Sequence, residues 1–391
     1  MMPRKDLNRI GVLEPDYDGW MAGAQFIRML CHSLGNACHD QGIDVYLLRE
    51  KWAGAASLPA RIESLDPPHY WYGEQFLRRV LFLRERSVLL ESALKHGLSV
   101  VLPLRRVGFK SANVKAIGWI PDFQHVLLPE YFSEKSCRYR NTAFRLLAER
   151  CNLLMLSSHN ALEHFAAFAP DYADKGRVAS FPSLYAYELP AGGAELARRK
   201  FNLPEKFALV ANQFWRHKNH EVVIDAIALL RRKGIILHVV MTGMPVDSRD
   251  PTNETLSRIL QQIASAGLNE QIRILGMLRF DDLANLMRTA AVVIQPSRFE
   301  GWSSVVQDGK ALGRPIICSD IPVHREQAPD ALGFFPCDSA ALLAELLAAN
   351  WQQLEPGPDP VVEASALTAE REFARVHGQR LLSICREADS H

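Results

Sequence analysis

Short apolar runs alternate with helical stretches along most of this chain, and that alternation limits the possible folds more than any other feature. The expected strands cover residues 8–13, 43–48, 100–104, 116–120, 153–156, 207–211, 236–242, 272–275 and 291–295. The expected helices include residues 24–37, 220–232, 255–266 and 281–290. Alternating strands and helices of these lengths predict parallel sheets covered on both faces. The expected fold class is therefore α/β.

The chain is expected to form two domains, because 391 residues exceed what one ordinary core supports. Pro190, Gly192, Gly193 and Pro204 cluster near the middle of the chain and mark the seam. We place the first domain at residues 1–185, the linker at 186–205 and the second domain at 206–391. A helical tail, residues 370–388, is expected to pack on either domain or to cross back to the first.

Composition narrows the class of protein. The chain is 48% apolar and 23% charged, which is typical of a globular protein, and its net charge of +1 gives no electrostatic case for nucleic acid. Its longest apolar runs fall far short of the roughly 20 residues of a membrane span, and the first residues lack the apolar core of a secretory signal. Seven cysteines without a Cys-x-x-Cys pair indicate a reducing compartment. We therefore expect a cytoplasmic protein.

A polar loop, residues 296–304, follows the last expected strand. Ligands of open parallel sheets bind at this end of a strand, and Glu300 lies within the loop. Ser303 or Ser304 is expected to cap the next helix and leave backbone N–H groups directed at an anion. Asp308 lies on that helix, where it either meets ribose hydroxyls or stabilises the helix dipole. Two acids around a helix N-terminus suit a ligand made of a sugar, a diphosphate and a ribose.

A basic loop, residues 211–220, follows the first expected strand of the second domain. Arg216 can grip a diphosphate as a planar fork, and Lys218 can do so as a mobile point charge. A solvated basic loop is the alternative. His217 and His220 are three residues apart but have no third ligand nearby, so no metal site is expected.

Two further loops precede or follow expected elements of the first domain. Residues 119–125 follow a strand, and their Pro-Asp turn, aromatic residue and His125 indicate a loop that reaches into a cleft. A structural histidine is the alternative. Residues 17–24 contain two glycines but no Gly-x-Gly-x-x-Gly, so a nicotinamide dinucleotide is disfavoured. Asp16 and Asp18 are interpreted as turn residues rather than metal ligands.

These loops resemble the retaining glycosyltransferases of family 4, which are common in bacterial polysaccharide and lipopolysaccharide assembly. Residues 299–315 resemble the Glu-x7-Glu signature of that family with its Gly-x-Pro tail, and residues 319–326 resemble the segment that follows. Residues 212–220 resemble the basic loop of one branch, and residues 121–125 resemble the acceptor-side loop of that branch. The resemblance implies the GT-B fold, in which two Rossmann-like α/β/α domains face each other across a cleft.

The resemblance also implies roles for individual residues. Glu300 would bind the transferred sugar, and Asp308 would bind the ribose. Lys218, with Arg216, would face the diphosphate, and His125 would lie near the sugar; Glu300, His125 and Lys218 are the expected catalytic group. The remaining expected donor contacts are Gly301, Trp302, Ser303, Ser304, Gln213 and Gly23.

Three positions depart from the pattern of that family. The second signature acid is Asp308 rather than Glu, so the nucleoside would lie slightly closer to the helix. Gln213 stands where many relatives have Arg, which leaves one positive charge fewer. Gly23 is followed by Ala24 where Gly-Gly is usual, which places a Cβ at a close backbone approach.

The function implied is a retaining hexosyltransferase of cell-envelope polysaccharide synthesis, including lipopolysaccharide and O-antigen. The donor would be a UDP- or GDP-sugar and the acceptor a glycan or a lipid-linked glycan, with no metal or other cofactor. Two alternatives stay open, a nucleotide-sugar epimerase of the same fold and a non-catalytic partner subunit. The residues do not specify the donor base, the sugar, the acceptor, the linkage or the oligomeric state.

A basic stretch could bring the protein to a membrane. Residues 76–110 contain eight Lys and Arg against two Glu. One stripe of a helix there would carry Leu77, Val80, Leu81, Arg84 and Val88. This pattern is typical either of a face that lies on an anionic bilayer, here the inner face of the cytoplasmic membrane, or of an ordinary core-facing helix.

Overall fold

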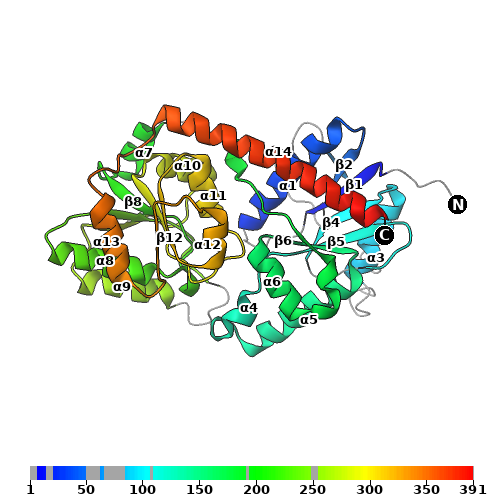
Figure 1. Ribbon diagram of the computed structural model, residues 1–391, viewed down its shortest axis with the longest axis horizontal. Coiled ribbons are helices and arrows are strands. Elements are labelled where there is room, and N and C mark those ends of the chain that lie inside the picture. Colours follow the sequence, from blue (N-terminus) through cyan, green and yellow to red (C-terminus); the bar gives the residue numbers. More distant parts are fainter. Residues whose placement is uncertain are drawn as a thin grey trace, which may run out of the picture. The chain divides into compact units, whose positions relative to one another are not determined.

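The computed structural model describes residues 7–14, 21–49, 62–65, 84–105, 109–190, 193–247 and 254–390. The chain forms two compact units. The first unit comprises Met1–Phe123, Lys135–Leu184 and Glu372–His391, and the second comprises Gln124–Glu134 and Tyr185–Arg371. Each unit holds one sheet flanked by helices (Figure 1). The expected α/β class is therefore confirmed.

The first unit is built on a seven-stranded parallel sheet in the order β3-β2-β1-β4-β5-β6-β7. Its strands are β1 (Arg9–Glu14), β2 (Asp44–Arg49), β3 (Glu63–Leu65), β4 (Val100–Leu104), β5 (Lys115–Ile120), β6 (Leu153–Leu156) and β7 (Gly176–Val178). Its helices are α1 (Met21–His39), α3 (Arg84–Lys95), α5 (Glu134–Arg150), α6 (His159–Phe168) and the 3-10 helix η2 (Pro170–Lys175). The strand order is that of doubly wound nucleotide-binding sheets with one strand added.

The second unit is built on a six-stranded parallel sheet in the order β10-β9-β8-β11-β12-β13. Its strands are β8 (Phe207–Val210), β9 (His238–Met241), β10 (Ile272–Ile274), β11 (Val292–Gln295), β12 (Ile316–Ser319) and β13 (Gly333–Phe335). Its helices are α4 (Gln124–Leu127), α7 (Ala194–Phe201), α8 (His220–Arg232), α9 (Thr255–Ser265), α10 (Phe280–Thr289), α11 (Ser304–Ala311), α12 (Pro322–Gln327), α13 (Ala340–Asn350) and the start of α14 (Pro360–Ser390). The 3-10 helices are η1 (Pro129–Tyr131), η3 (Leu184–Ala186) and η4 (Arg216–Lys218).

The strand order of the second sheet reverses between β8 and β11, which are direct neighbours. Such a switch point opens a crevice at the carboxyl ends of the two strands, where ligands of open parallel sheets bind. The loops expected to carry chemistry, residues 211–220 and 296–304, are the continuations of these two strands. The fold therefore brings both loops to the same edge of the sheet.

The alternation of side chains along β11 builds the two cores of the second unit. Val292 and Ile294 belong to the core beneath α8, α9 and α13, while Val293 belongs to the core beneath α10 and α11. All four residues of β11 are buried. A central parallel strand covered on both faces has this continuous burial. It holds the loop after β11 on a rigid base.

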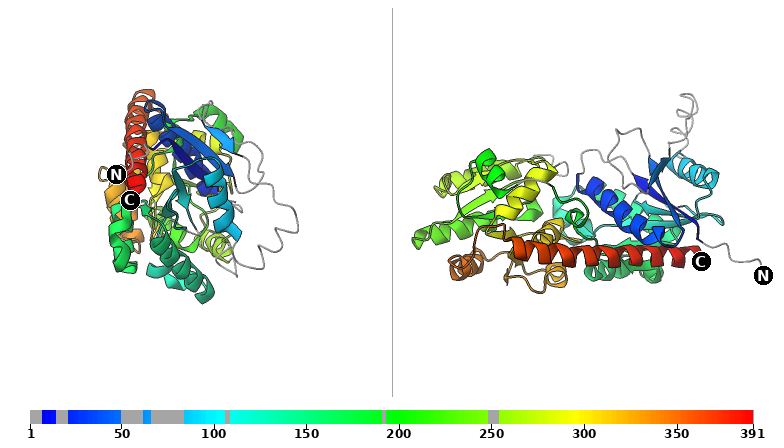
Figure 2. Two further views of the ribbon diagram at one scale, coloured as in Figure 1. Left: turned by 90° about the vertical axis from the view of Figure 1, so that its right-hand side faces the viewer. Right: turned by 90° about the horizontal axis from the view of Figure 1, so that it is seen from above.

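Helix α14 is one unbroken helix of 31 residues (Figure 2). Its first part belongs to the second unit, where Glu363 forms a two-pronged ion pair with Arg288 at 2.7 and 2.8 Å. Its last part, from Glu372, belongs to the first unit, where His377 contacts Ser33 at 2.9 Å. The tail expected at residues 370–388 is thus the later part of a longer helix.

Several expectations about domain boundaries differ from what the structure shows. The second unit begins at Tyr185, and the stretch expected as a linker contains α7, which an ion pair of 2.7 Å between Lys200 and Asp282 joins to α10. Residues 124–134 group with the second unit, whereas the first domain expected from the sequence, residues 1–185, includes them. Gly23 lies in the first turn of α1 rather than in a loop, because that helix begins at Met21.

Some expectations concern residues outside the described ranges. They include Asp16, Asp18, Leu77, Val80 and Leu81. None of the helices in the described ranges has the length and hydropathy that a bilayer span requires. The described residues also contain no group of three or more His, Cys, Asp or Glu side chains arranged to hold a metal ion.

Candidate functional site

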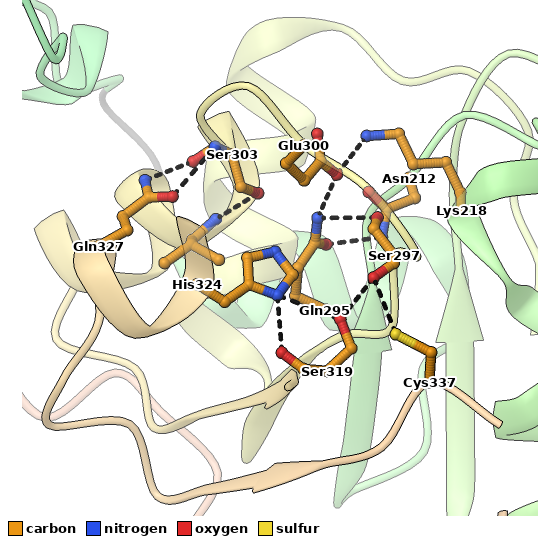
Figure 3. Close-up of polar contacts among 11 residues, drawn as sticks. Asn212, Lys218, Gln295, Ser297, Glu300, Ser303, Ser319, His324, Gln327 and Cys337 are labelled. Atoms are coloured by element: carbon orange, nitrogen blue, oxygen red, sulfur yellow. Dashed lines mark hydrogen bonds and ion pairs between the residues drawn. The ribbon is translucent and has the colours of Figure 1, made fainter. Parts of the chain in front are cut away.

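Glu300 and Lys218 meet at the switch point of the second sheet (Figure 3). The ammonium of Lys218 lies 2.6 Å from Oε1 of Glu300, and the two side chains are only 13% and 10% exposed. Both loops are tied together on either side of this pair. The N–H of Arg298 donates to the carbonyl of His217, and the side chain of Asn219 donates to the carbonyl of Pro296. The two loops that carry the pair are therefore joined by hydrogen bonds as well as by the ion pair itself.

A second donor contacts the same oxygen of Glu300. Nε2 of Gln295 lies 2.8 Å from Oε1, and Oε1 of Gln295 accepts a hydrogen bond of 2.8 Å from Nδ2 of Asn212. Both hydrogen bonds that Glu300 receives from described residues end on Oε1. Its Oε2 points away from this network (Figure 3), so one carboxylate oxygen can still accept a hydroxyl.

The N-terminus of α11 forms the neighbouring part of the site. Ser303 is the N-cap, as expected, since its hydroxyl accepts the N–H of Val306 at 3.3 Å; Ser304 is the exposed first residue of the helix. The side-chain amide of Gln327, from α12, pairs with both backbone groups of Ser303, accepting from its N–H at 3.0 Å and donating to its carbonyl at 2.7 Å. Gly313, with a φ of 63°, lies just beyond the end of the helix. The loop that carries Gly301 and Trp302 is thus anchored at its end.

The basic loop continues beyond Lys218. Arg216 is exposed, and its guanidinium lies 5.0 Å from the centre of the Tyr131 ring. Tyr131 belongs to η1, which follows α4 with its buried His125. The segment that carries His125 therefore packs beside the basic loop, within the second unit. This placement was not foreseen from the sequence.

Gln213 is engaged by its own unit. Its Oε1 accepts the N–H of Met244 at 2.6 Å, which ties the loop after β8 to the loop after β9. Between them Gly243 adopts a φ of 156°, and a Cβ there would lie 2.1 Å from the carbonyl oxygen of Asn212. Only glycine permits this close approach. The structure thus shows a role for Gln213 in shaping the loop, and its contact with a donor stays a prediction.

Asp308 lies in the second turn of α11 and is half-buried. Burial raises the pKa of the Tyr185 phenol well above its ordinary value, and the carboxylate of Asp308 adds to this effect. Asp308 therefore lies close enough to Tyr185 for its charge to be felt. Its contact with a ribose is untested by this geometry and stays a prediction.

Two buried histidines of the second unit stay neutral near pH 7. Burial lowers the pKa of His220 to about 3, and its ring stacks on Phe214. Burial also lowers the pKa of His324, whose Nδ1 lies 3.1 Å from the hydroxyl and 2.9 Å from the carbonyl oxygen of Ser319. His220 is the first residue of α8. Neither ring has the surroundings of a metal ligand.

The structure thus brings Glu300, Lys218 and Ser303 to one sheet edge, while Gly23 belongs to the other unit. Sequence reasoning missed Gln295, Asn212 and Gln327 as parts of the site. Gln295 did carry a signal, because it ends an otherwise apolar strand at the edge where ligands bind.

Comparison with known proteins finds a family match over the part of the chain that contains the Glu300 network. Residues 194–364, which include every residue of the Glu300 network, match the family described as glycosyl transferases group 1. The D-inositol 3-phosphate glycosyltransferase of Salinispora tropica is 31% identical over 132 residues, which are 32% of this chain and 27% of that enzyme. The chain thus spans about a quarter of the length of that curated relative.

Solved structures match over nearly the whole chain. A glycosyltransferase from Rickettsia africae has a TM-score of 0.66 at 15% identity and covers 98% of this chain and 99% of its own. Anabaena HepE in complex with UDP-glucose has a TM-score of 0.60 at 14% identity and covers 98% of both chains. The fold is that of the GT-B glycosyltransferases. The match to the glycosyl transferases group 1 family lies entirely within the second unit.

Proposed function

We propose that this protein is a retaining glycosyltransferase that moves a hexose from a UDP- or GDP-sugar to a glycan or lipid-linked acceptor. The observation that carries the proposal is the Glu300–Lys218 pair at the switch point of the second sheet. Oε2 of Glu300 is available to accept a sugar hydroxyl. Lys218 has three N–H groups and gives one to Glu300, which leaves two for phosphate oxygens.

The chemistry needs positive charge at the leaving group. The acceptor oxygen forms a bond to the anomeric carbon, and the bond from that carbon to the diphosphate breaks with its electron pair going to the phosphate oxygen. The proton of the acceptor hydroxyl leaves with that phosphate. Because negative charge grows there, the ammonium of Lys218 and the N-terminus of α11 favour the transition state.

Retention follows if the acceptor attacks from the face on which the diphosphate departs, because the new bond then forms on the side where the old bond breaks. On that face the leaving phosphate can take the proton of the acceptor hydroxyl. We name no side chain as a covalent nucleophile. Arg216 is proposed to join Lys218 on the diphosphate, and Gly301, Trp302 and Gly23 to complete the donor site. His125 is proposed to lie near the sugar, and Asp308 to bind the ribose. The metal-free reaction and the cell-envelope pathway rest on the sequence resemblance.

Thermal unfolding with nucleoside diphosphates tests the donor site. A ligand at 100 times its Kd stabilises the folded state by about 2.7 kcal/mol, so one of UDP, GDP, ADP and CDP should raise Tm clearly above the others. The sugar conjugate of that nucleotide should then be consumed only when an acceptor glycan is present. An epimerase would convert the donor alone, and a non-catalytic subunit would bind it without turnover. Absence of binding by all four nucleotides would remove the proposal.

A further inference from the structure

A chain of buried side-chain amides ends on the carboxylate of Glu300. Asn212 follows β8, Gln295 ends β11, and the two side chains are 2% and 0% exposed. Asn212 donates to Gln295, and Gln295 donates to Glu300, each at 2.8 Å (Figure 3). The chain of contacts therefore runs across the switch point, from one strand to its neighbour.

We call the series Asn212, Gln295 and Glu300 the amide relay. The chemistry of its groups determines which of them donates and which accepts each hydrogen bond. An ionised carboxylate only accepts hydrogen bonds, so Gln295 must turn its NH₂ towards Glu300. Its carbonyl oxygen then faces Asn212, which must in turn present its own NH₂. Nε2 of Gln295 has a second acceptor in Ser297 at 3.1 Å, which uses its remaining proton. Both hydrogens of the Gln295 amide are thus engaged, and its orientation is fixed.

The amide relay determines which oxygen of Glu300 accepts hydrogen bonds from the protein. Gln295 and Lys218 both donate to Oε1, at 2.8 and 2.6 Å, and together they use the two lone pairs of that oxygen. Lys218 alone is a mobile point charge that can contact either oxygen of a carboxylate. A neutral amide in a fixed orientation removes this freedom. Gln295 therefore keeps Oε2 as the oxygen that faces outward.

We propose that Gln295 is a positioning residue for glycosyl transfer, which holds Glu300 in the rotamer that presents Oε2 to the sugar. This inference rests on the proposed function of the same site. Gln295 touches no substrate in this role and acts through Glu300. A buried amide costs free energy unless its hydrogen bonds are made, and an apolar residue would fill the end of this apolar strand more cheaply. The amide is therefore explained by what it does to Glu300.

The first test replaces Gln295 by leucine, with Gln271→Leu as the matched control. Gln271 is also buried, but it lies at the opposite end of the second sheet, where its Nε2 bonds to the carbonyl of Leu237 at 3.3 Å. Both variants lose one buried amide. Because misplacement of a reacting group by about 1 Å can cost roughly 10²-fold, Gln295→Leu should lower turnover by about that factor. Its affinity for the free nucleoside diphosphate should not change, and Gln271→Leu should keep wild-type turnover.

The second test uses Gln295→Glu, which keeps the size and shape of the side chain. A protonated Glu at this position donates to Glu300 as the amide does, whereas two ionised carboxylates repel each other. The ratio of kcat/KM in the variant to that in the wild type should therefore fall roughly tenfold or more from pH 6.5 to 8.5. Among the described residues, the titratable groups that interact with Glu300 are Lys218, His324 and Cys318. Burial lowers the pKa of His324 and raises that of Cys318 to about 12. Both groups are also present in the wild type, so their titration cancels in the ratio.

The outcomes separate this inference from the proposed function. A folded Gln295→Leu variant with wild-type turnover, or a Gln295→Glu ratio that does not change with pH, overturns the positioning role while glycosyl transfer stands. If Gln295→Leu does not fold, the pH dependence of Gln295→Glu decides. A wild-type protein that neither binds a nucleoside diphosphate nor transfers a sugar overturns both. Reduced turnover with unchanged nucleotide affinity and a falling ratio supports the relay.

Discussion

Lys218 and Glu300 are 82 residues apart in the chain, and their charged groups lie 2.6 Å apart in the structure. Both side chains are nearly buried, where taking two charges out of water costs free energy that their attraction repays only in part. A hydrophobic pair would fill the same space at less cost. This cost supports the proposed function, in which the two charges meet a ligand that carries both hydroxyl and phosphate groups.

Glu300→Gln should abolish most transfer while leaving the nucleotide site intact. The amide keeps the shape of the side chain but loses the charge that orients the sugar hydroxyl and holds Lys218. We expect turnover to fall about 10²–10³-fold, with unchanged affinity for the free nucleoside diphosphate. Steady-state kinetics and calorimetric titration give the two quantities. A folded variant with wild-type turnover would contradict the role of Glu300.

Lys218→Ala should lose turnover by a similar factor, about 10²–10³-fold, because the growing charge on the diphosphate is no longer neutralised. It should also lower Tm, since Glu300 then stays buried without a counter-charge. The double variant Lys218→Ala with Glu300→Gln should have a higher Tm than Lys218→Ala alone, although it stays inactive. Additive changes in Tm would show that the two charges do not depend on each other.

Most of the fold could be predicted because buried parallel strands are continuous apolar runs. Residues 100–104 and 153–156 form β4 and β6 with the expected bounds, and α8 begins and ends as expected. The unit to which each segment belongs could not be predicted in the same way. Residues 124–134 belong to the second unit through packing that no local pattern records. Helix α14 also begins ten residues before the expected tail, at Pro360, where proline is tolerated in a first turn.

In the candidate site, too, features of the local sequence could be predicted, whereas contacts between distant residues could not. Glu300 and Lys218 could be found because each stands in a loop of recognisable composition after a strand. The hydrogen bond between Asn212 and Gln295 joins residues that are 83 positions apart. A single amide at the end of an apolar strand gives no indication of which residue it contacts. Gln327 likewise contacts Ser303 from a separate helix. Such contacts depend on which strands are neighbours, and that is a property of the sheet.

Glu363→Ala should destabilise the second unit. Glu363 is 9% exposed in its side chain, and its two oxygens accept from Nε and Nη2 of Arg288, which would be left without this partner. Removing one member of a buried ion pair typically costs 3–5 kcal/mol, so we expect a loss of about 3 kcal/mol. Urea unfolding followed by intrinsic fluorescence measures it. Glu372→Ala, in the exposed pair with Arg375 on the same helix, is the control and should produce no measurable change. Equal effects of the two substitutions would contradict this account of α14.

His377 should make the first unit sensitive to acid. Burial lowers its pKa to about 3 in the folded protein, whereas an unfolded histidine titrates near 6.5. Between these values the unfolded chain binds one proton more than the folded one, so the free energy of unfolding falls as the pH falls. The slope from this one group approaches about 1.4 kcal/mol per pH unit in the middle of the window.

His377→Gln tests this by removing the titrating group while keeping a side chain that can bond to Ser33. The variant should lose less stability than the wild type when the pH falls from 7 to 5. Urea unfolding at each pH gives the free energy of unfolding, and its slope against pH should differ between the two proteins by nearly one proton at about pH 5. His220, whose pKa burial also lowers to about 3, is unchanged in both proteins, so its contribution cancels in the comparison. If the stability of the two proteins depends on pH in the same way, His377 takes up its proton in the folded protein as it does in the unfolded chain. That result would contradict a buried neutral ring in the contact between α14 and α1.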